Sequence, residues 1–197
     1  MTNLYLASQS PRRRELLSQI GVQYQPLSVD VEECQGDSEQ PSDYVQRLAI
    51  DKSTAGWRAL QHANLPAAPV MGADTIVVLD GQVLEKPKNE AAAIAMLARL
   101  SGRIHHVFTA VALTSSSAQN VVLSSTEVTF TRISEFQARQ YWQTGEPKDK
   151  AGGYGIQGAG AVFVESLAGS YSGVVGLPLF ETQQLLNQFD VSVWQFD

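Results

Sequence analysis

The stretch VMGADTIVVL, from Val70 to Leu79, places a single carboxylate inside an almost continuous apolar run. A run of this length and composition predicts a buried strand, and the Asp80-Gly81 dipeptide after it predicts a hairpin turn. Burying the ionised Asp74 carboxylate is costly unless it meets a cation or a metal ion. Asp74 at a strand end facing water is the alternative. We favour a functional role because Gly72 and Ala73 leave room beside the carboxylate for a ligand.

Short apolar runs alternate with helical patterns on both sides of this stretch, which predicts a mixed α/β fold. Helix start and stop signals are clear at several points: Ser10 precedes Pro11, Asn89 precedes an apolar helix ending near Gly102, and Ser134 with Gln137 forms a capping-box pattern. Further strands are predicted at Leu4–Ser8, Tyr24–Val29, Ile104–Leu113, Val121–Phe130 and Val191–Trp194, and further helices at Ser42–His62 and from Pro178 to about Asn187. The glycine-rich stretch Gly145–Gly176 is predicted to form short strands and tight turns near a site.

The composition is that of an ordinary globular protein of 197 residues with a formal charge of −6. One domain over residues 1–197 is the expected organisation, with two small lobes as the alternative. The negative charge argues against stable binding to nucleic acid, which needs a broad positive field. Cys34 is the only cysteine, which excludes an intrachain disulfide framework and zinc-binding cysteine clusters.

Nothing in the sequence predicts a membrane segment. The apolar run Leu4–Ala7 is short and precedes the arginines instead of following them, so it does not resemble a signal peptide. No uncharged apolar run is long enough for a spanning helix. We therefore expect a cytoplasmic protein without membrane partners.

The segment from Ser8 to Arg13 is the first candidate for ligand binding. It runs from a strand end into a helix whose first turn carries Arg12 and Arg13. Cations there oppose the helix dipole, so their presence favours a bound phosphate, with solvated surface arginines as the alternative.

The other candidates are weaker when each is taken alone. Glu32 and Glu33 could join Asp74 around a hard divalent cation, although such a pair is more often a solvated loop. Lys52 and Lys86, together with Lys148 and Lys150, are ordinary surface lysines unless their positions bring them to a site. The loop around Gln157 lacks a dinucleotide-binding pattern, but close approach of its glycines to a planar base, with the Gln157 amide contacting the base edge, is a reasonable function.

Taken together, these segments resemble the Maf family of nucleoside triphosphate pyrophosphatases. The blocks that carry the resemblance follow the family's order over most of the chain: Leu6–Arg13, Glu32-Glu33, Gly72–Val78, Leu84–Pro87, Ser101–Arg103, Thr109–Ala112, Asp149–Gly152, Tyr154–Gly158, Gly169–Tyr171 and Val174–Pro178. The resemblance implies an elongated mixed sheet with flanking helices and two lobes around a deep cleft, as in the inosine-triphosphatase-like fold, and often a homodimer.

The resemblance also implies hydrolysis of a nucleoside triphosphate to the monophosphate and pyrophosphate with a divalent metal, Mg²⁺ or Mn²⁺. By this resemblance Asp74 is the catalytic acidic residue and a metal ligand, and Glu33 is a second metal ligand. Thr75 and Gln157 are similar to the dTTP/UTP-type subgroup. The positions that match substrate-binding residues are Ser8, Arg12, Arg13, Lys52, Thr75, Lys86 and Gln157.

These expectations leave two kinds of function open. The first is an enzyme that removes dTTP, UTP or modified pyrimidine nucleotides from the nucleotide pool. The second is a regulator of cell division or septum formation that binds nucleotide without hydrolysing it.

Overall fold

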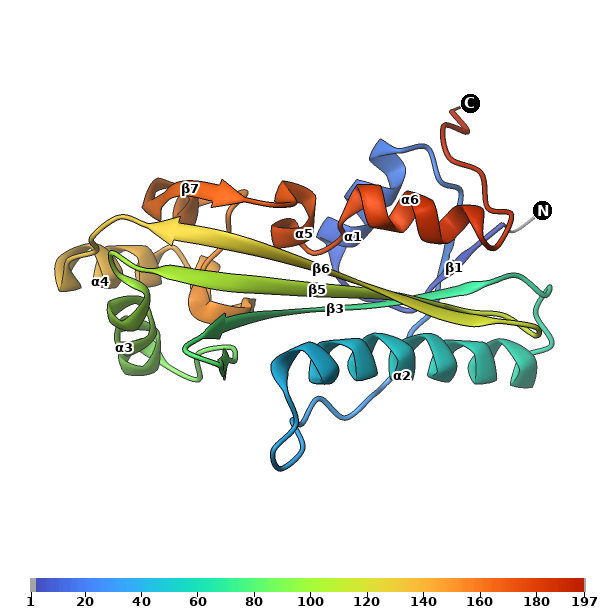
Figure 1. Cartoon of the computed structure of the whole chain (residues 1–197), viewed down its shortest axis with the longest axis horizontal. Coiled ribbons are helices and arrows are strands. Elements are labelled where there is room, and N and C mark those ends of the chain that lie inside the picture. Colours follow the sequence, from blue (N-terminus) through green and yellow to red (C-terminus); the bar gives the residue numbers. More distant parts are fainter. Residues whose placement is uncertain (1–2, 197) are drawn as a thin grey trace. The chain divides into compact units, whose positions relative to one another are not determined.

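The computed structural model describes residues 3–196 and has a mixed α/β architecture (Figure 1). The strands are β1 (Tyr5–Leu6), β2 (Gln25–Pro26), β3 (Val70–Leu79), β4 (Gln82–Leu84), β5 (Ile104–Thr114), β6 (Gln119–Phe130) and β7 (Val164–Ala168). The α-helices are α1 (Pro11–Gln19), α2 (Pro41–His62), α3 (Glu90–Leu100), α4 (Glu135–Gln143), α5 (Tyr171–Val175) and α6 (Leu179–Asn187). Three 3₁₀ helices, η1 (Glu146–Asp149), η2 (Ala151–Gly153) and η3 (Ala159–Phe163), follow α4.

The seven strands form one mixed sheet in the order β2-β1-β3-β5-β6-β7, with β4 paired to β3 outside this path. The short strand β1 is parallel to both β2 and β3, whereas β4 pairs with β3 and β7 with β6 in antiparallel fashion. This arrangement confirms the predicted mixed sheet with flanking helices.

The chain divides into two compact units, and it passes between them several times. The first unit contains Met1–Asp74, Thr109–Ser124 and Gly176–Asp197, and the second contains Thr75–Phe108 and Ser125–Val175. Strands β3, β5 and β6 each contribute residues to both units. None of the helices described between residues 3 and 196 is both long enough and apolar enough to cross a membrane.

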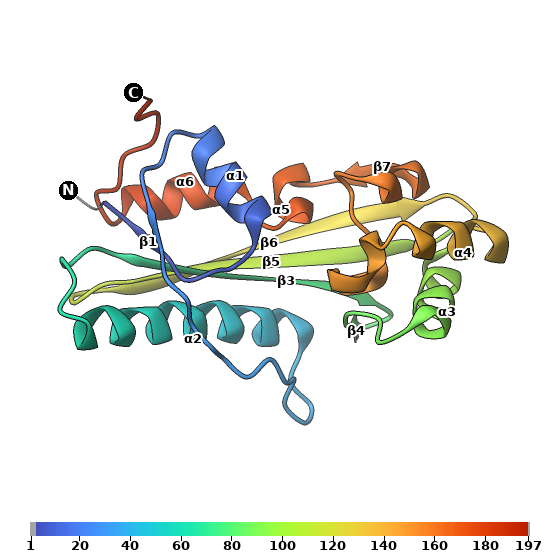
Figure 2. The same ribbon diagram turned by 180° about the vertical axis from the view of Figure 1, so that it is seen from behind.

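In the first unit, α2 covers one face of the strands and α1 and α6 cover the other, as the two opposite views show (Figures 1 and 2). One of its core clusters joins Tyr5 and Ala7 to Val70 of β3 and Leu60 of α2. Gly56 makes close packing possible there, because a Cβ atom at this position would lie 2.7 Å from Val70 Cγ1. Glycine has a low helix propensity, yet α2 runs through Gly56 without interruption.

In the second unit, α3 and α4 pack beside the ends of β5 and β6. The core cluster joins Leu97 and Leu100 of α3 to Val128 and Phe130 of β6, among other buried residues. Val128 and Phe130 are 0% and 1% exposed, whereas Glu127 before them is exposed and Thr129 between them is half-buried, as expected for the alternating faces of a strand.

Most predicted elements are confirmed, and one strand prediction is wrong. Residues 191–194 form no strand. Instead, the Trp194 and Gln195 N–H groups donate to the carbonyl groups of Ile20 and Gly21 at the end of α1. The glycine-rich stretch contains the predicted tight turns, but they are built mainly as 3₁₀ helices, with β7 as the one strand among the residues described there.

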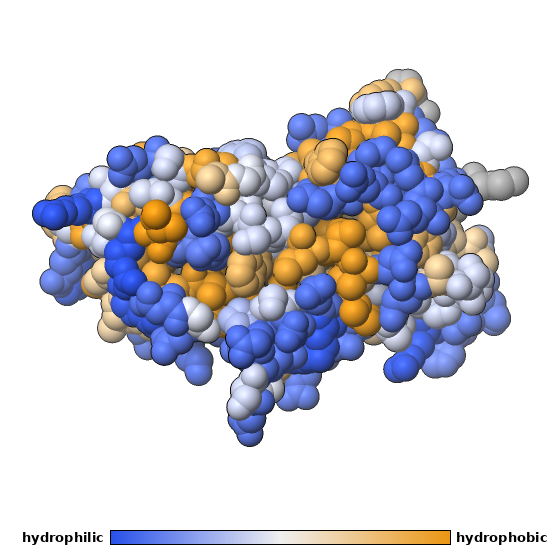
Figure 3. Space-filling model, in the orientation of Figure 1, coloured by the Kyte–Doolittle hydropathy of each residue, from blue (hydrophilic) through white to orange (hydrophobic). Residues whose placement is uncertain are grey.

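Large apolar side chains also reach the surface, which is a patchwork of polar and apolar residues (Figure 3). The most exposed of them are Val162, Trp194, Phe136, Phe180, Phe196, Ile104 and Tyr171.

Candidate functional site

The turn between β1 and α1 is organised by the Ser8 hydroxyl. Its Oγ accepts hydrogen bonds from the Ser10 N–H, at 3.3 Å, and from Arg13 Nη1, at 3.1 Å. Ser10 is the predicted N-cap residue of α1, but its side chain makes no capping hydrogen bond, and the first turn holds no acidic residue. The N-terminal end of α1 therefore keeps its positive partial charge available for an anion.

Arg13 and Arg12 are adjacent in this turn but lie in different environments. Arg13 is buried, and its Nε donates to the Gly176 carbonyl at 2.8 Å. Burial lowers the pKa of Arg13, and the negative charges of Asp74 and Glu33 partly oppose this effect. Arg12 is half-buried and makes no hydrogen bond or ion pair within residues 3–196. Arg12 is thus available for a ligand.

Lys52 joins the two predicted acidic residues. Its Nζ lies 2.5 Å from Glu33 Oε1 and 2.6 Å from Asp74 Oδ1. The Lys52 and Asp74 side chains are each only 12% exposed, whereas the Glu33 side chain is 43% exposed. The cation expected beside the buried Asp74 carboxylate is therefore the Lys52 ammonium group.

Close packing of α2 on β3 brings Lys52 to Asp74. Gly72 lies in β3 two residues before Asp74, and a Cβ atom there would be 2.3 Å from the Ala49 carbonyl oxygen and 2.4 Å from the Ser53 nitrogen. The backbone of α2 therefore fills the space beside Gly72. The expectation that Gly72 leaves room for a ligand is wrong, because a helix occupies that room.

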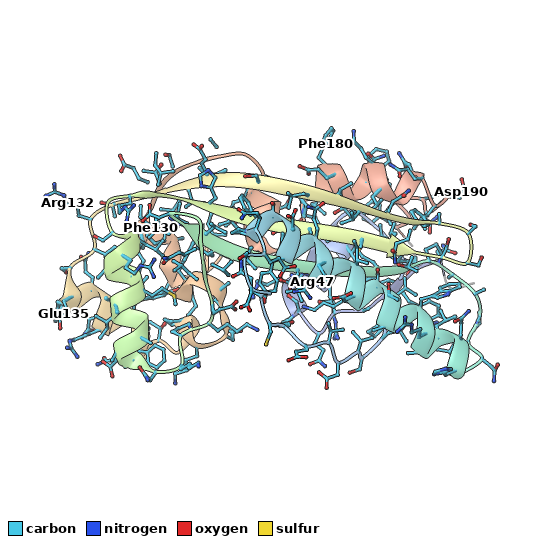
Figure 4. The ribbon with its side chains drawn as sticks, turned by 60° about the horizontal axis from the view of Figure 1, so that its bottom comes forward. Arg47, Phe130, Arg132, Glu135, Phe180 and Asp190 are labelled. Carbon is cyan, nitrogen blue, oxygen red and sulfur yellow. The ribbon has the colours of Figure 1, made fainter. Side chains whose placement is uncertain are left out.

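Arg47, which the sequence analysis did not single out, fastens the loop that carries Glu33. It lies on α2 (Figure 4), donates to both carboxylate oxygens of Glu39 at 2.7 and 2.9 Å, and donates to the Cys34 carbonyl at 2.9 Å. The hydrogen bond from Arg47, with that from the Gly36 N–H, lowers the pKa of Glu39 to about 2. The only local signal in the sequence was the spacing of Arg47 and Asp51 on one helix face.

The first unit thus contains Ser8 in the β1–α1 turn, Arg12 and Arg13 on α1, Glu33 in the loop between β2 and α2, Lys52 on α2 and Asp74 on β3. These residues include three cations and two carboxylates, so the cluster carries a net positive charge inside a protein of charge −6. Such a cluster suits a polyanionic ligand that binds together with a cation.

The remaining predicted residues belong to the second unit. Thr75 follows Asp74 directly in β3 and is half-buried. Lys86 is exposed in the loop after β4, and Gln157 is exposed in the turn between η2 and η3. Lys150 binds the Glu146 carbonyl and the Asp149 carboxylate, so within this unit it has a structural role.

The histidines do not form a metal site. His105 is buried against Phe130 and Tyr154, and its Nε2 shares a 2.8 Å hydrogen bond with the Tyr154 hydroxyl. Burial lowers the pKa of His105 to about 4, so the ring is neutral at pH 7. Across residues 3–196, no three side chains of the His, Cys, Asp or Glu type gather closely enough to hold a metal by themselves.

Comparison with known proteins gives consistent matches over nearly the whole chain. A family model described as Maf-like protein matches residues 3–189. A dTTP/UTP pyrophosphatase of Saccharophagus degradans is 59% identical over 98% of this chain and 91% of its own length. Proteins of the same name from Pseudoalteromonas atlantica and Aliivibrio fischeri are 54% and 52% identical, over 96% and 94% of this chain and 98% and 97% of their own lengths. Among solved structures, the Ham1 protein of Staphylococcus aureus matches with a TM-score of 0.47 and 16% identity, over 66% of this chain and 72% of that one.

Proposed function

Because the chain belongs to the Maf-like family, we propose that it is a nucleoside triphosphate pyrophosphatase that hydrolyses dTTP and UTP. The products are the nucleoside monophosphate and pyrophosphate. The names of its relatives support this choice of substrates. The resemblance of Thr75 and Gln157 to the dTTP/UTP-type subgroup supports it as well.

The observation that carries the proposal is the pairing of Lys52 with both Glu33 and Asp74 beside the buried Arg13. Phosphoryl-transfer enzymes work mainly by positioning the phosphates and neutralising their charge. Here an uncapped helix end, two arginines and a lysine are gathered with two carboxylates in one unit. Such a set of groups suits the hydrolysis of a phosphoanhydride.

The residues divide the work of the reaction. Asp74 would orient a water molecule and take its proton as the water oxygen bonds to the α phosphorus. The bond from the α phosphorus to the bridging oxygen then breaks, and pyrophosphate leaves. Arg12, Arg13 and Lys52, with Lys86, would neutralise the negative charge that grows on the leaving group.

The donor set also fits a divalent cation. Glu33 and Asp74 point their oxygens at one ammonium group, so the two carboxylates converge on a common positive charge. Mg²⁺ is commonly held by one or two carboxylates together with substrate phosphate oxygens. We propose that Glu33 and Asp74 hold Mg²⁺ or Mn²⁺, which when bound supplies Lewis-acid polarisation of the phosphates.

The test is an assay of pyrophosphate release from each common nucleoside triphosphate, with dTTP and UTP expected as the best substrates. Asp74→Asn keeps the shape of the side chain but removes its charge and its basicity, so kcat is expected to fall at least ~10²-fold. Asp190→Asn is the matched control, because Asp190 is an exposed loop residue with a positive φ angle that asparagine also tolerates (Figure 4).

The outcomes of the assay distinguish the proposed enzyme from the non-hydrolysing regulator. Turnover lost in Asp74→Asn and retained in Asp190→Asn supports the proposed reaction and the role of Asp74. Normal turnover in Asp74→Asn would remove Asp74 from the chemistry. Nucleotide binding without any cleavage would favour the non-hydrolysing regulator of cell division.

We also propose that the protein acts in the cytoplasm and as a homodimer. The resemblance to the Maf family supports both proposals. Sedimentation equilibrium tests the second of them, because a dimer has twice the 21.4 kDa of the chain.

A further inference from the structure

The Glu146 carboxylate is surrounded by hydrogen-bond donors from α4 and from the glycine-rich loop. The Tyr141 hydroxyl donates to Oε1 at 2.7 Å, the Ala159 N–H to Oε2 at 2.8 Å and the Gly160 N–H to Oε1 at 3.2 Å. Tyr141 in turn accepts a hydrogen bond from the Gly155 N–H at 3.0 Å. One carboxylate and one hydroxyl thus hold the backbone on both sides of residues 156–158.

These contacts keep Glu146 ionised despite its partial burial. Burial alone would raise its pKa, but the hydrogen bonds from Tyr141, Ala159 and Gly160 outweigh that effect and lower the pKa. Hydrogen bonds to an ionised acceptor are about twice as strong as neutral ones. At pH 7 the carboxylate therefore holds the loop in its charged, strongly bonding form.

The glycines of the loop are needed for this packing. A Cβ atom at Gly158 would lie 2.1 Å from Glu146 Oε2, one at Gly155 would lie 2.9 Å from Glu146 Oε1, and one at Gly160 would lie 2.5 Å from the Tyr141 hydroxyl. On the side where a Cβ atom would lie, these glycines therefore pack around Glu146 and Tyr141.

Gln157 lies between the anchored residues. The Gly158 N–H donates to the Gly155 carbonyl at 3.4 Å, which closes a four-residue turn with Gln157 inside it. The Gln157 side chain is exposed and makes no hydrogen bond within residues 3–196. Its amide is thus unengaged while the backbone on both sides of it is held.

We propose that Glu146 is a positioning residue that sets the nucleotide preference of this protein, by holding the turn that presents the Gln157 amide to a pyrimidine base. The inference rests on the proposed function, because that function gives Gln157 a base to recognise. A uracil or thymine edge offers both donors and acceptors, and an amide can match them only when its orientation is fixed.

The test compares Glu146→Gln with Glu165→Gln. The first change removes the charge and places a donating amide against the N–H groups of Ala159 and Gly160. The second is the matched control, because Glu165 is exposed on β7 and makes no hydrogen bond or ion pair within residues 3–196. Tyr141→Phe is a milder variant that releases Gly155 but leaves the two backbone bonds to Glu146.

We expect Glu146→Gln to raise the KM for dTTP and UTP roughly tenfold, with kcat within about threefold of wild type, and to reduce the preference for UTP over ATP roughly tenfold. Tyr141→Phe is expected to move the same quantities in the same direction by a smaller factor. A residue with a merely structural role would lower stability, seen in thermal unfolding, without changing the preference between bases.

Calorimetric binding of α,β-methylene-UTP and α,β-methylene-ATP separates this inference from the proposed reaction, because neither analogue needs to be cleaved. A preference for the uridine analogue that is present in wild type and Glu165→Gln but lost in Glu146→Gln supports the inference, even if the wild-type protein cleaves nothing. An unchanged preference in both Glu146→Gln and Tyr141→Phe, or no preference in wild type, overturns it.

Discussion

At the residue scale, Lys52 is the side chain on which the candidate site depends. Two carboxylates close to one another repel, and the ammonium group between them offsets this repulsion. The sequence predicts that Asp74 needs a cation, and the family resemblance places Lys52 among the substrate-binding positions, but neither pairs the two residues, which are 22 positions apart in the chain. The packing of α2 on β3 makes that pair.

Lys52→Met is therefore expected to lower kcat/KM for dTTP at least ~10²-fold, because a charge that neutralises the phosphates is lost. The same variant is expected to bind Mn²⁺ without nucleotide roughly tenfold more tightly, since a competing cation is removed from Glu33 and Asp74. Titration with Mn²⁺ followed by electron paramagnetic resonance measures this affinity. Lys148→Met, which changes an exposed lysine over the Trp142 ring, is the control. Unchanged Mn²⁺ affinity in Lys52→Met would contradict the shared cation site.

His105 predicts how stability depends on pH. Burial holds its folded-state pKa at about 4, below the ordinary histidine value of 6.5. The unfolded chain therefore takes up the proton first as the pH falls, and the free energy of unfolding decreases between about pH 6.5 and pH 4. The expected slope from this residue is about 1.4 kcal/mol per pH unit.

Urea unfolding at several pH values checks this prediction. His105→Gln can keep a hydrogen bond to Tyr154 and is expected to flatten the decrease between pH 6.5 and pH 4. His62→Gln changes an exposed histidine at the end of α2 and is expected to leave the decrease as in wild type. If the free energy of unfolding falls equally steeply with pH in wild type and His105→Gln, groups other than His105 cause the decrease.

At the scale of secondary-structure elements, the contact between α2 and β3 leaves no space for a side chain at Gly72. Gly72→Ala forces a methyl group against two backbone atoms of α2, at 2.3 and 2.4 Å, so the helix has to move. We expect a loss of roughly 3 kcal/mol in the free energy of unfolding, together with reduced turnover because Lys52 moves with α2.

Gly81→Ala is the control for this prediction. Gly81 lies in the β3–β4 turn with a φ angle of +75°, and nothing lies within 4 Å of an added Cβ atom. Only the backbone penalty remains, about 1–2 kcal/mol. Both values come from urea unfolding curves, and a Gly72→Ala protein as stable as Gly81→Ala would argue against the tight contact.

Elements defined by local signals were predictable, and those defined by distant partners were not. The capping box of Ser134 and Gln137 and the Asn89 N-cap of α3 are confirmed, because each involves residues three positions apart. The strand predicted at 191–194 failed because an apolar run needs a neighbouring strand, and this one meets the end of α1 instead. Glu146 was likewise visible in the sequence, but nothing local showed that residues 13 and 14 positions later would bind its carboxylate.

At the scale of the whole molecule, the net charge sets the range of partners. The positive cluster around Arg12, Arg13 and Lys52 is local, whereas the chain as a whole carries −6. A single nucleotide can be attracted by the cluster alone, but a long nucleic acid also meets the negative remainder.

We therefore expect no binding of a fluorescently labelled DNA duplex at about 0.15 M salt, with protein up to ~10⁻⁵ M, when anisotropy is measured. Binding of dTTP under the same conditions is the positive control. A Kd for the duplex tighter than ~10⁻⁶ M would contradict the exclusion of nucleic acid and would reopen a regulatory role on DNA.

The second unit is completed earlier in the sequence than the first, which affects folding during protein synthesis. All residues of the second unit have been translated by Val175, whereas the first unit still needs the segment that begins at Gly176. That residue provides the carbonyl group to which Arg13 donates. A nascent chain can therefore complete its second unit on the ribosome while Arg13, in the turn proposed to bind phosphate, still lacks its acceptor. The candidate cluster is then completed late in synthesis, so unfinished chains lack the full set of contacts around Arg13.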